Sequence, residues 1–449
     1  MRVVIIGAGV AGHRLASRLC DEKHDVVVVD HRPHPLEEIA SELDVQTVLG
    51  SGISPGALEE AGVAKAGLVA TVTNRDEVNI LAAAFAHAAG AQYTAARVSN
   101  DELSAERHVD NLSALGIDLV VNEHDECALE VLSVLNLGGA KEIVRMAGGR
   151  IQAVGTDVLP GSPLLAGPLR NFPHPEILGN VRLIAVMRRE KLLMPHGDTV
   201  FEAKDTIYCV GQPTDVQAFL NTVRPHKTAV HKVVVAGGGD VGLRLARHLE
   251  RTGKQVVVIE ESTERAYECS ASLKKCMVIS GSALDPTVLN EIGITPNTAI
   301  VASTGNDENN MIACLLAQKL GAALGVAIIS KPEYVSIINE AGLLDRAVSP
   351  YYATMNAILR FVRGASILAI TLLQSVPGEL LEVHVSGGSR WVGRALRDAR
   401  LPKRAIVAAV VRGDVAGIGT GNTVLQEGDR LIVFAPLGVA SKLESVFRK

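Results

Sequence analysis

The chain has 449 residues, of which 47% are hydrophobic and 21% are charged, and its formal net charge is −5. This length exceeds what one hydrophobic core serves, so it predicts several domains, and the composition excludes an intrinsically disordered chain. The negative net charge argues against a nucleic-acid-binding protein, which usually presents a basic stripe.

The six cysteines show neither a CxxC pair nor zinc-ligand spacing, so we predict reduced core thiols in a cytosolic protein and no metal site. We also expect no signal peptide, because the first residues lead directly into a strand. The most apolar stretch, residues 312–330, is interrupted by Gln318 and Lys319. It predicts a buried helix followed by a buried strand and not a membrane span.

Short apolar runs alternate with helical patterns at the beginning of the chain. These runs are VVII (3–6), VVVV (26–29), LVATV (68–72) and YTAARV (93–98). Continuous apolar strands are buried on both faces, which is typical of a parallel sheet covered by helices. Thr73 and Asn74 each precede an acidic residue by three positions, and this spacing predicts a capping box for the next helix.

The following region has a different pattern. β-type runs joined by Gly-Asp and Pro-Gly turns predict small α+β domains there and again at the end of the chain. These runs are VRLIAVMRR (181–189), AIVAAVVR (405–412) and RLIVFA (430–435). Residues 211–228 carry Pro, Gly and Thr, and we interpret them as a connection between two halves.

Both kinds of unit occur twice, in the same order and at nearly constant offsets, which indicates an internal duplication. The matched stretches are 3–30 with 233–260, 58–63 with 289–294, 73–80 with 304–311, 161–170 with 387–397, and 197–205 with 421–429. We therefore predict an α/β protein with two Rossmann-like domains, each followed by a small α+β domain. The predicted boundaries are 1–125, 140–222, 230–350 and 365–449.

A glycine turn opens each Rossmann-like half. The pattern GxGxxG after a strand gives a tight turn, close backbone approach to a pyrophosphate and close packing of helix on strand. The helix N-terminus then offers N–H groups and a partial positive charge to phosphate. An acidic residue follows each turn by 18 positions, at the end of the next strand, where it can accept hydrogen bonds from ribose hydroxyls. The predicted residues are Gly7, Gly9, Gly12 and Asp30 in the first half, and Gly237, Gly239, Gly242 and Glu260 in the second.

These two carboxylates also bear on the choice of ligand. A carboxylate at the ribose repels a 2′-phosphate, so NAD or ADP/ATP is favoured over NADP. His31 and Arg32 weaken this preference in the first half, whereas Glu261 reinforces it in the second.

Two more places lie at the carboxyl edge of the predicted sheet, where open α/β sheets bind their ligands. Thr73 and Asn74 follow the fourth strand, with Ser303-Thr304 as counterpart, and they either bind the ligand or only cap a helix. Arg97 ends the fifth strand and either binds phosphate or forms a salt bridge. The second half has Ile328 at the position of Arg97, and Lys331 is a shifted substitute.

Catalytic residues are not apparent. A dehydrogenase needs a positioned acid or base, and neither small domain shows a His/Asp or Lys/Tyr constellation. We interpret His196 beside Asp198 as a structural turn, because the repeat has Thr420 and Asn422 there, and His384 as a packing or surface residue. The nucleotide is therefore expected to be sensed and not consumed.

A resemblance to a known family extends over essentially the whole chain. It is carried by the motifs GAGVAGHRLASRL, TNRDEVNI, GGGDVGLRLARHL, NDENNM, GSPLLAGPLR and GNTVLQEGDRLIVF. The chain resembles the TrkA family, the peripheral cytosolic subunits of Trk-type potassium uptake systems, in which each half contains an RCK (KTN) domain and an RCK_C domain. The resemblance implies binding of NAD(H) and adenine nucleotides (ATP or ADP). It also implies a homo-oligomeric gating ring, a dimer or tetramer, at the inner face of the cell membrane. The implied partner is an integral-membrane potassium-translocating subunit.

The resemblance also implies which residues bind the nucleotide. In the first half these are Gly7, Ala8, Gly9, Val10, Ala11, Asp30, Thr73, Asn74 and Arg97; in the second they are Gly237, Gly238, Gly239, Asp240, Val241 and Glu260. The second half lacks the arginine, and both halves have Gly-Ser where the family often has Gly-Asp after the third strand. Two alternatives stay open: an NAD-dependent oxidoreductase with a duplicated Rossmann fold, and a free-standing nucleotide or redox sensor.

Overall fold

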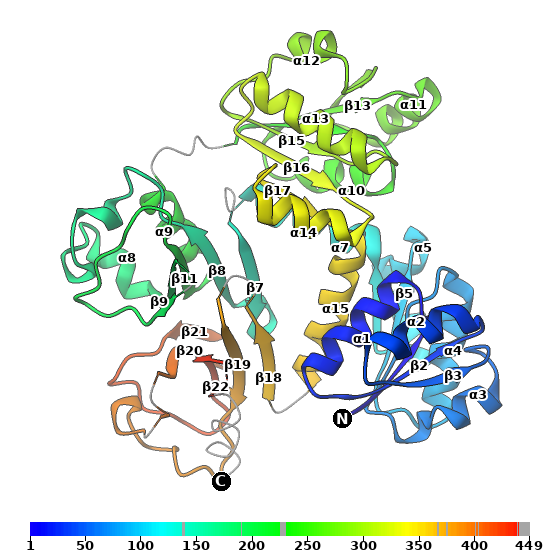
Figure 1. Cartoon of the computed structure of the whole chain (residues 1–449), viewed down its shortest axis with the longest axis horizontal. Helices are drawn as coiled ribbons and strands as arrows, with labels where there is room; N and C mark the ends of the chain where they lie inside the picture. Colours follow the sequence, from blue (N-terminus) through cyan, green and yellow to red (C-terminus); the bar gives the residue numbers. More distant parts are fainter. Residues whose placement is uncertain are drawn as a thin grey trace. The chain divides into compact units, whose positions relative to one another are not determined.

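The described part of the chain forms four β-sheets that fall into two compact units (Figure 1). This computed structural model describes residues 1–136, 140–189, 191–224, 230–365, 368–373, 376–399, 401–402, 404–437 and 439. One unit comprises Met1–Leu132 with Val230–Val362, and the other comprises Ser133–Ala229 with Arg363–Lys449. The two Rossmann-like sheets thus share one unit and the two small domains share the other, although they alternate along the chain.

The first sheet is parallel throughout, with the strand order β3-β2-β1-β4-β5-β6. Its strands are β1 (Arg2–Ile6), β2 (Asp25–Asp30), β3 (Gln46–Leu49), β4 (Leu68–Thr71), β5 (Thr94–Val98) and β6 (Leu119–Asn122). The helices between and after them are α1 (Val10–Asp21), α2 (Pro33–Glu42), α3 (Pro55–Glu60), α4 (Asp76–Ala88), α5 (Asp101–Ser104), α6 (Glu106–Ala114) and α7 (Glu123–Asn136). This is the doubly wound order, which reverses direction between β1 and β4.

Alternate residues of the central strands face opposite layers of helices. Val3 and Ile5 of β1 share a core with the buried residues of α1 and α2, whereas Val4 and Ile6 share another with those of α3 and α4. Both faces are therefore buried, which explains the uninterrupted apolar runs and confirms the predicted parallel sheet.

The second sheet repeats this order as β14-β13-β12-β15-β16-β17, again parallel. Its strands are β12 (Lys232–Ala236), β13 (Gln255–Glu260), β14 (Met277–Ser280), β15 (Thr298–Ala302), β16 (Leu324–Ile328) and β17 (Arg346–Val348). Its helices are α10 (Asp240–Leu249), α11 (Thr263–Ser272), α12 (Pro286–Ile292), α13 (Asp307–Lys319), α14 (Pro332–Ala341) and α15 (Pro350–Ala365). Residues 312–330 fall mostly on α13 and β16, so a helix and a buried strand occur as predicted, but the helix is only half-buried because Ile312 and Leu315 are exposed.

Helix α15 follows the second sheet in sequence but packs on the first. Its buried residues Ala357, Ile358, Leu359 and Val362 belong to the core formed by β1, α1 and α2 (Figure 1). Arg360 of α15 also pairs with Glu126 of α7 at 2.6 Å. The two halves are therefore joined by a shared core as well as by the chain, which the sequence pattern did not predict.

The other unit contains two antiparallel sheets, with the orders β10-β9-β11-β8-β7 and β18-β19-β22-β20-β21. The first is built from β7 (Glu142–Met146), β8 (Ile151–Asp157), β9 (Val181–Arg188), β10 (Lys191–Leu193) and β11 (Thr206–Gly211), with α8 (Pro175–Asn180) and α9 (Pro213–Val223). The second is built from β18 (Leu368–Leu372), β19 (Gly378–His384), β20 (Ile406–Arg412), β21 (Val415–Ile418) and β22 (Arg430–Pro436). Buried residues of the two sheets, among them Tyr208 and Phe434, share one core.

An arginine–aspartate pair recurs in these two small domains. Arg188 pairs with Asp205 at 2.6 Å, and Arg412 pairs with Asp429 at 2.7 Å. Each arginine also donates to a backbone carbonyl of the intervening turn, that of Val200 or Val424. The repeated Gly-x-Thr-Val…Asp stretch thus forms the same arginine–aspartate pair across a turn in both small domains.

The predicted connection over residues 211–228 is wrong in its first part. Pro213 begins helix α9, where its missing N–H is tolerated, and Val216, Phe219 and Leu220 bury the helix on the antiparallel sheet. Residues 225–228 lie outside the described part of the chain, as does the predicted domain end at 440–449. Within the described residues, no helix is long and apolar enough to cross a membrane.

Candidate nucleotide-binding sites

The first glycine turn joins β1 to α1 and is fixed by sterics. Gly7 adopts φ +112°, which favours glycine, and its N–H donates to the carbonyl of Val29 at 2.8 Å. A Cβ at Gly12 would lie 1.8 Å from the carbonyl oxygen of Gly7, so only glycine allows α1 to pack this closely. A Cβ at Gly9, by contrast, would meet no atom within 4 Å. Gly9 therefore borders open space at the N-terminus of α1.

Asp30 joins the end of β2 to this turn. Its side chain is 5% exposed, and its Oδ2 accepts a hydrogen bond from the N–H of Ala8 at 2.8 Å. Arg32 donates to Oδ1 from its backbone at 2.9 Å and from Nε at 3.3 Å, and His31 Nδ1 lies 3.3 Å away. Burial disfavours the charge on Asp30, but the hydrogen bonds from Ala8 and Arg32 outweigh it and lower the pKa. The carboxylate thus stays ionised beside the turn.

The second turn has the same backbone and the same link to an acid. Gly237 adopts φ +106°, and a Cβ at Gly242 would lie 2.0 Å from the carbonyl oxygen of Gly237. Glu260 Oε2 accepts from the N–H of Gly238 at 2.6 Å, and its Oε1 accepts from Ser262 at 3.0 Å. Asp240 and Val241 begin α10, as Val10 and Ala11 begin α1. The structure therefore brings the predicted glycines and acids together in both halves.

The turn after the fourth strand is organised differently from the prediction. Helix α4 begins at Asp76 with Arg75 as N-cap and no side-chain cap among the described residues, so the predicted capping box is wrong. Thr73 is instead held by Asn79, whose Oδ1 accepts from the Thr73 N–H at 2.9 Å and from its hydroxyl at 2.6 Å. Asn74 is exposed beside this turn.

Asn79 is a residue that the sequence analysis missed. Its Nδ2 donates to the carbonyl of Arg97 at 2.9 Å, so it ties the turn to β5. Asn310 does the same in the second half, accepting from Thr304 N at 2.9 Å and donating to Ile328 O at 2.8 Å. The counterpart of Thr73 is therefore Thr304, one position later than the predicted Ser303.

A second pair of missed residues fixes the loop after the fifth strand. Asp76 accepts from the backbone N–H groups of Ser99 and Asn100 at 3.0 and 2.9 Å. Asp307 accepts from Ser330 and Lys331, both at 2.9 Å. The signal for both pairs was the repeat itself, because TNRDEVNI and TGNDENNM share the aspartate and the final asparagine at the same offset.

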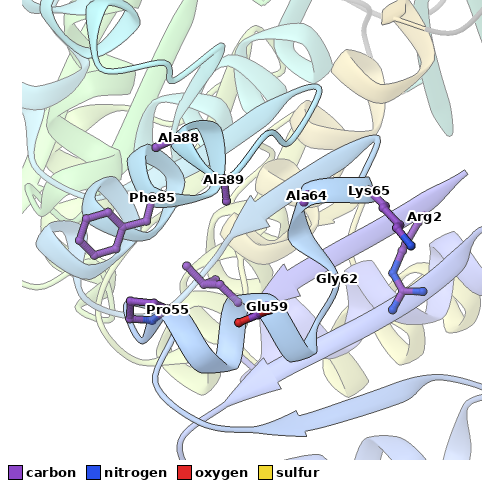
Figure 2. A pocket seen from close by; sticks show the side chains of 10 residues that line it. Arg2, Pro55, Glu59, Gly62, Ala64, Lys65, Phe85, Ala88 and Ala89 are labelled. Atoms are coloured by element: carbon purple, nitrogen blue, oxygen red, sulfur yellow. The ribbon is translucent and has the colours of Figure 1, made fainter.

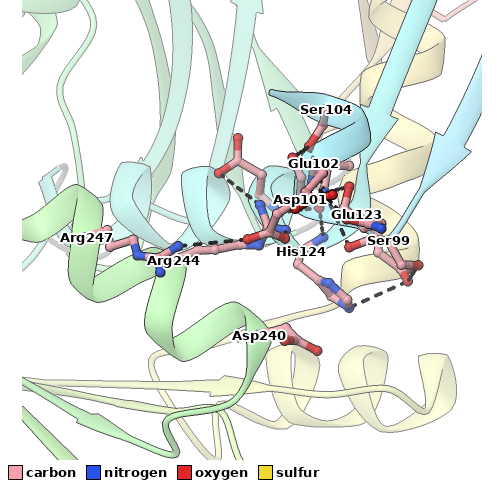
Figure 3. Close-up of polar contacts among 12 residues, drawn as sticks. Ser99, Asp101, Glu102, Ser104, Glu123, His124, Asp240, Arg244 and Arg247 are labelled. Carbon is pink, nitrogen blue, oxygen red and sulfur yellow. Dashed lines mark hydrogen bonds and ion pairs between the residues drawn. The ribbon is translucent and has the colours of Figure 1, made fainter. Parts of the chain in front are cut away.

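Arg97 forms a buried ion pair beside the Thr73 turn. Its Nη2 lies 2.6 Å from Glu123 Oε1, and the two side chains are only 11% and 9% exposed. Its Nη1 donates to the carbonyl of Thr73 at 3.2 Å. Ser99 also donates to Glu123, and His124 lies beside it (Figure 3). Arg97 therefore links the Thr73 turn to the first residue of α7.

Charged residues also connect the two halves near this point. Arg244 of α10 pairs with Asp101 of α5 and lies 3.9 Å from Asp125 of α7, as Figure 3 shows for Arg244 and Asp101. His248 lies 3.0 Å from Asp125. In the same unit, Arg14 of α1 lies 3.2 Å from Glu333 of α14. The first helix of each half thus contacts the helix that directly follows the fifth strand of the other half, and α10 also contacts α7.

A pocket of about 790 Å³ occupies the other edge of the first sheet. Arg2, the first residue of β1, lines it together with Leu58 of α3, Lys65 of the 3-10 helix that follows α3, and Phe85 of α4 (Figure 2). The glycine turn follows the last residue of this strand, so the pocket and the turn lie at opposite ends of β1. The pocket is therefore separate from the candidate nucleotide site.

His196 and His384, which we interpreted from the sequence as structural residues, lie in a turn and at the end of β19. His196 accepts from the Asp198 N–H at 3.2 Å and its own N–H donates to Thr199 at 2.9 Å. Thr420 donates to Thr423 in the same way at 3.0 Å, so both turns share one scaffold. For His384, burial first and the charge of Arg430 second lower the pKa. All six cysteines are free thiols, and four of them are buried.

Comparison with known proteins agrees with this arrangement. The model of the TrkA-N domain matches residues 3–123 and 233–350, and that of the TrkA-C domain matches 157–224 and 380–448. The chain belongs to the TrkA family. The resemblance seen in the sequence is thereby confirmed, as is the fold class with its internal duplication.

Relatives of similar length support this membership. The TrkA-family chain is 33% identical over 448 residues to a Trk system potassium uptake protein TrkA homolog of Archaeoglobus fulgidus, covering 100% of both proteins. It is 32% identical over 442 residues to the Trk system potassium uptake protein TrkA of Halomonas elongata, covering 97% of this chain and 95% of that protein.

Two solved structures share the fold at 18% sequence identity. The GsuK channel bound to NAD has a TM-score of 0.59 and aligns with 100% of this chain and 79% of that chain. The GsuK RCK domain has a TM-score of 0.57, with coverage of 100% and 95%.

Proposed function

We propose that this TrkA-family chain is a non-catalytic regulatory subunit that senses NAD(H) and adenine nucleotides and gates a membrane potassium uptake system. Its relatives are named potassium uptake proteins. The observation that carries the proposal is that both glycine turns hold an acid by a backbone hydrogen bond, that of Asp30 to Ala8 and that of Glu260 to Gly238. Both turns lie at the carboxyl edge of a parallel sheet, within one compact unit.

The proposed ligands follow from the chemistry of these edges. Open helix N-termini suit a diphosphate, and a carboxylate at the end of the second strand suits ribose hydroxyls. The structurally similar GsuK channel has been solved with NAD. The proposed binding residues are Gly7, Ala8, Gly9, Val10, Ala11, Gly12, Asp30, Thr73, Asn74 and Arg97, with Gly237, Gly238, Gly239, Asp240, Val241, Gly242 and Glu260.

Arg97 offers a route by which an occupied first site can influence the rest of the chain. Its guanidinium contacts the Thr73 turn on one side and Glu123 on the other. Glu123 begins α7, and the last residues of that helix belong to the unit of antiparallel sheets. A phosphate that attracts Arg97 competes with Glu123 and so acts on the start of α7.

Such a signal acts as a population shift. A nucleotide biases two conformations only through its different affinity for them, and a tenfold bias corresponds to about 1.4 kcal/mol. One charge-assisted hydrogen bond present in a single conformation is of that size. We propose that the bias is transmitted in a homo-oligomer, a dimer or tetramer. This assembly docks at the inner face of the cell membrane on the potassium-translocating subunit.

Two measurements test the proposal. Co-purification of the full chain with a membrane potassium-translocating subunit, followed by ion flux with NAD, NADH, ATP or ADP, tests regulation, and flux indifferent to every nucleotide contradicts it. Calorimetric titration then tests the site, using Gly9→Asp and Gly239→Asp to disable each turn. A Cβ at Gly9 would meet no atom within 4 Å, and a Cβ at Gly239 would meet only the carbonyl oxygen of Ser303 at 4.0 Å, so the new carboxylate repels phosphate without a steric clash.

Arg97→Ala in the Gly239→Asp chain distinguishes the two roles left open for this arginine. A phosphate contact predicts a loss of ATP affinity of about one to two decades, with a smaller loss for NAD. Equal losses of affinity for ATP, ADP and NAD show that Arg97 stabilises the folded site through Glu123 and does not contact phosphate. Asp30→Ala is expected to weaken all three ligands, because all three present the same adenosine ribose.

The oxidoreductase alternative predicts turnover. With NADH and a panel of carbonyl substrates, we expect no loss of absorbance that depends on both substrate and protein. Turnover that tracks with the purified chain, and that Gly9→Asp abolishes, contradicts the sensing role.

A further inference from the structure

An arginine from helix α11 lies at the second glycine turn. Arg265, in the first turn of α11, donates from Nε to the carbonyl oxygen of Gly238 at 3.1 Å. Its Nη2 lies 3.7 Å from Asp240 Oδ1, and its Nη1 lies 2.7 Å from Glu268. The side chain is 35% exposed. This guanidinium therefore lies directly beside the turn, on its solvent side.

The pair of Arg265 and Asp240 is specific to the second half. At the constant offset of 230, the first half has Pro35 and Val10 at these two positions. Asp240 is the first residue of α10, so its backbone belongs to the proposed binding turn, but the charge of its side chain opposes the binding of an anion at the helix N-terminus. The half that has this acid also has the arginine that contacts it.

We propose that Arg265 binds a phosphate of the nucleotide in the second turn and that Asp240 holds Arg265 there while the turn is empty. This inference rests on the proposed function, since it assigns a ligand contact within one of its two sites. The comparison of Arg97 with Ile328 suggested that the second turn lacks an arginine. On this proposal the second turn has one. Its arginine comes from α11 instead of β5.

The strengths of the two contacts favour the exchange. The Asp240 carboxylate is 69% exposed and lies beyond hydrogen-bond distance, so its pairing with Arg265 is weak. A phosphate at the same place gains both the helix N-terminus and a charge-assisted hydrogen bond to the guanidinium. Glu268, one helical turn further along α11, keeps the guanidinium over the turn in both states.

The test uses the full chain with the first turn disabled by Gly9→Asp, titrated with ADP and with adenosine. Arg265→Ala is expected to weaken ADP binding about tenfold or more and to leave adenosine binding unchanged, because adenosine has no phosphate. Arg265→Lys is expected to restore part of the loss, and Asp240→Asn to strengthen ADP binding. Arg251→Ala, which removes a cation just beyond the opposite end of α10, is the matched control and is expected to bind ADP normally.

Three results overturn the inference. ADP binding unchanged in Arg265→Ala removes the phosphate contact. Equal losses for ADP and adenosine, together with a lower unfolding temperature of the nucleotide-free variant, assign Arg265 a structural role. Failure of the Gly9→Asp chain to bind ADP, while the unmodified chain binds it, shows that the second turn is not a site and leaves the proposed function standing. Failure of the unmodified chain to bind any nucleotide contradicts the proposed function itself.

Discussion

The two glycine turns of this chain have one backbone and two sets of charges. Gly7 and Gly237 share a positive φ, and in both halves a later glycine lies against the carbonyl of the first. Around the first turn, Arg32 pairs with the ribose-position acid and Arg97 is buried against Glu123. Around the second, the acid has no ion pair among the described residues, and Arg265 lies over the turn. The comparison teaches that sterics fix the backbone of the turn, whereas the charged side chains around it are free to differ between the halves.

The largest expected effect tests the shared backbone. Gly12→Ala and Gly242→Ala place a Cβ about 2 Å from a backbone carbonyl oxygen, which cannot rotate away. We expect each to destabilise the chain by about 3 kcal/mol, the upper end of overpacking costs, measured by denaturant unfolding. Gly9→Ala is the matched control, because its Cβ meets open space. A small effect at Gly242 alone indicates that the second turn is looser than the first.

The buried ion pair of the first half gives the next largest effect. Glu123→Gln removes the charge that faces Arg97, and we expect a loss of about 2 kcal/mol in the free energy of unfolding. The second half has Ile328 in place of Arg97, so no equivalent loss exists there. The double-mutant cycle with Arg97→Met measures the coupling of the pair. A coupling near zero contradicts the role assigned to this pair in linking the turn to α7.

Much of the fold was predictable because the sequence repeats its periodic patterns. Apolar runs buried on both faces specify parallel strands, and the duplicated GxGxxG with an acid 18 residues later specifies the place of the proposed nucleotide sites. The pairing of the two Rossmann-like sheets in one unit was not predictable. It depends on long-range packing of α15 on the first sheet, which leaves no local pattern.

The candidate site was predictable only where backbone geometry demands a residue type. Gly7 and Gly12 satisfy such a demand, and Asp30 lies at a fixed strand end. Asn79 was missed because its function is to bridge a turn and a strand distant in sequence. Arg265 was missed because comparison at a fixed offset looks only for what the first half already has. The capping box was wrong because Thr73 bonds to Asn79 instead.

The acids beside the two glycine turns, Asp30 and Glu260, are also expected to contribute differently to the free energy of unfolding, and the contribution of Asp30 depends on pH. The pKa of Asp30 is lowered in the folded chain, so it stabilises folding above its unfolded pKa of about 3.9, and this contribution is lost as pH falls through the folded value. We expect Asp30→Asn to cost about 1 kcal/mol at pH 7 and the difference from the unmodified chain to shrink toward pH 3. Glu260→Gln is expected to cost less at pH 7, because no ion pair of Glu260 exists among the described residues. Equal losses contradict a special role for Arg32.

The contacts between the halves provide the smallest expected effect. Arg14 and Glu333 are 36% and 67% exposed, so water and salt screen their pair. The corresponding Arg244 is 9% exposed, and burial, followed by the charge of Arg247, lowers its pKa to about 10. We expect Arg14→Ala to change the free energy of unfolding by about 0.5 kcal/mol or less and Arg244→Ala to change it more, because the buried arginine also loses the packing of its stem. The double-mutant cycle of Arg14→Ala with Glu333→Ala measures the first pair alone, at low and high salt. A salt-independent coupling above about 1 kcal/mol requires a desolvated pair and therefore contradicts this ranking.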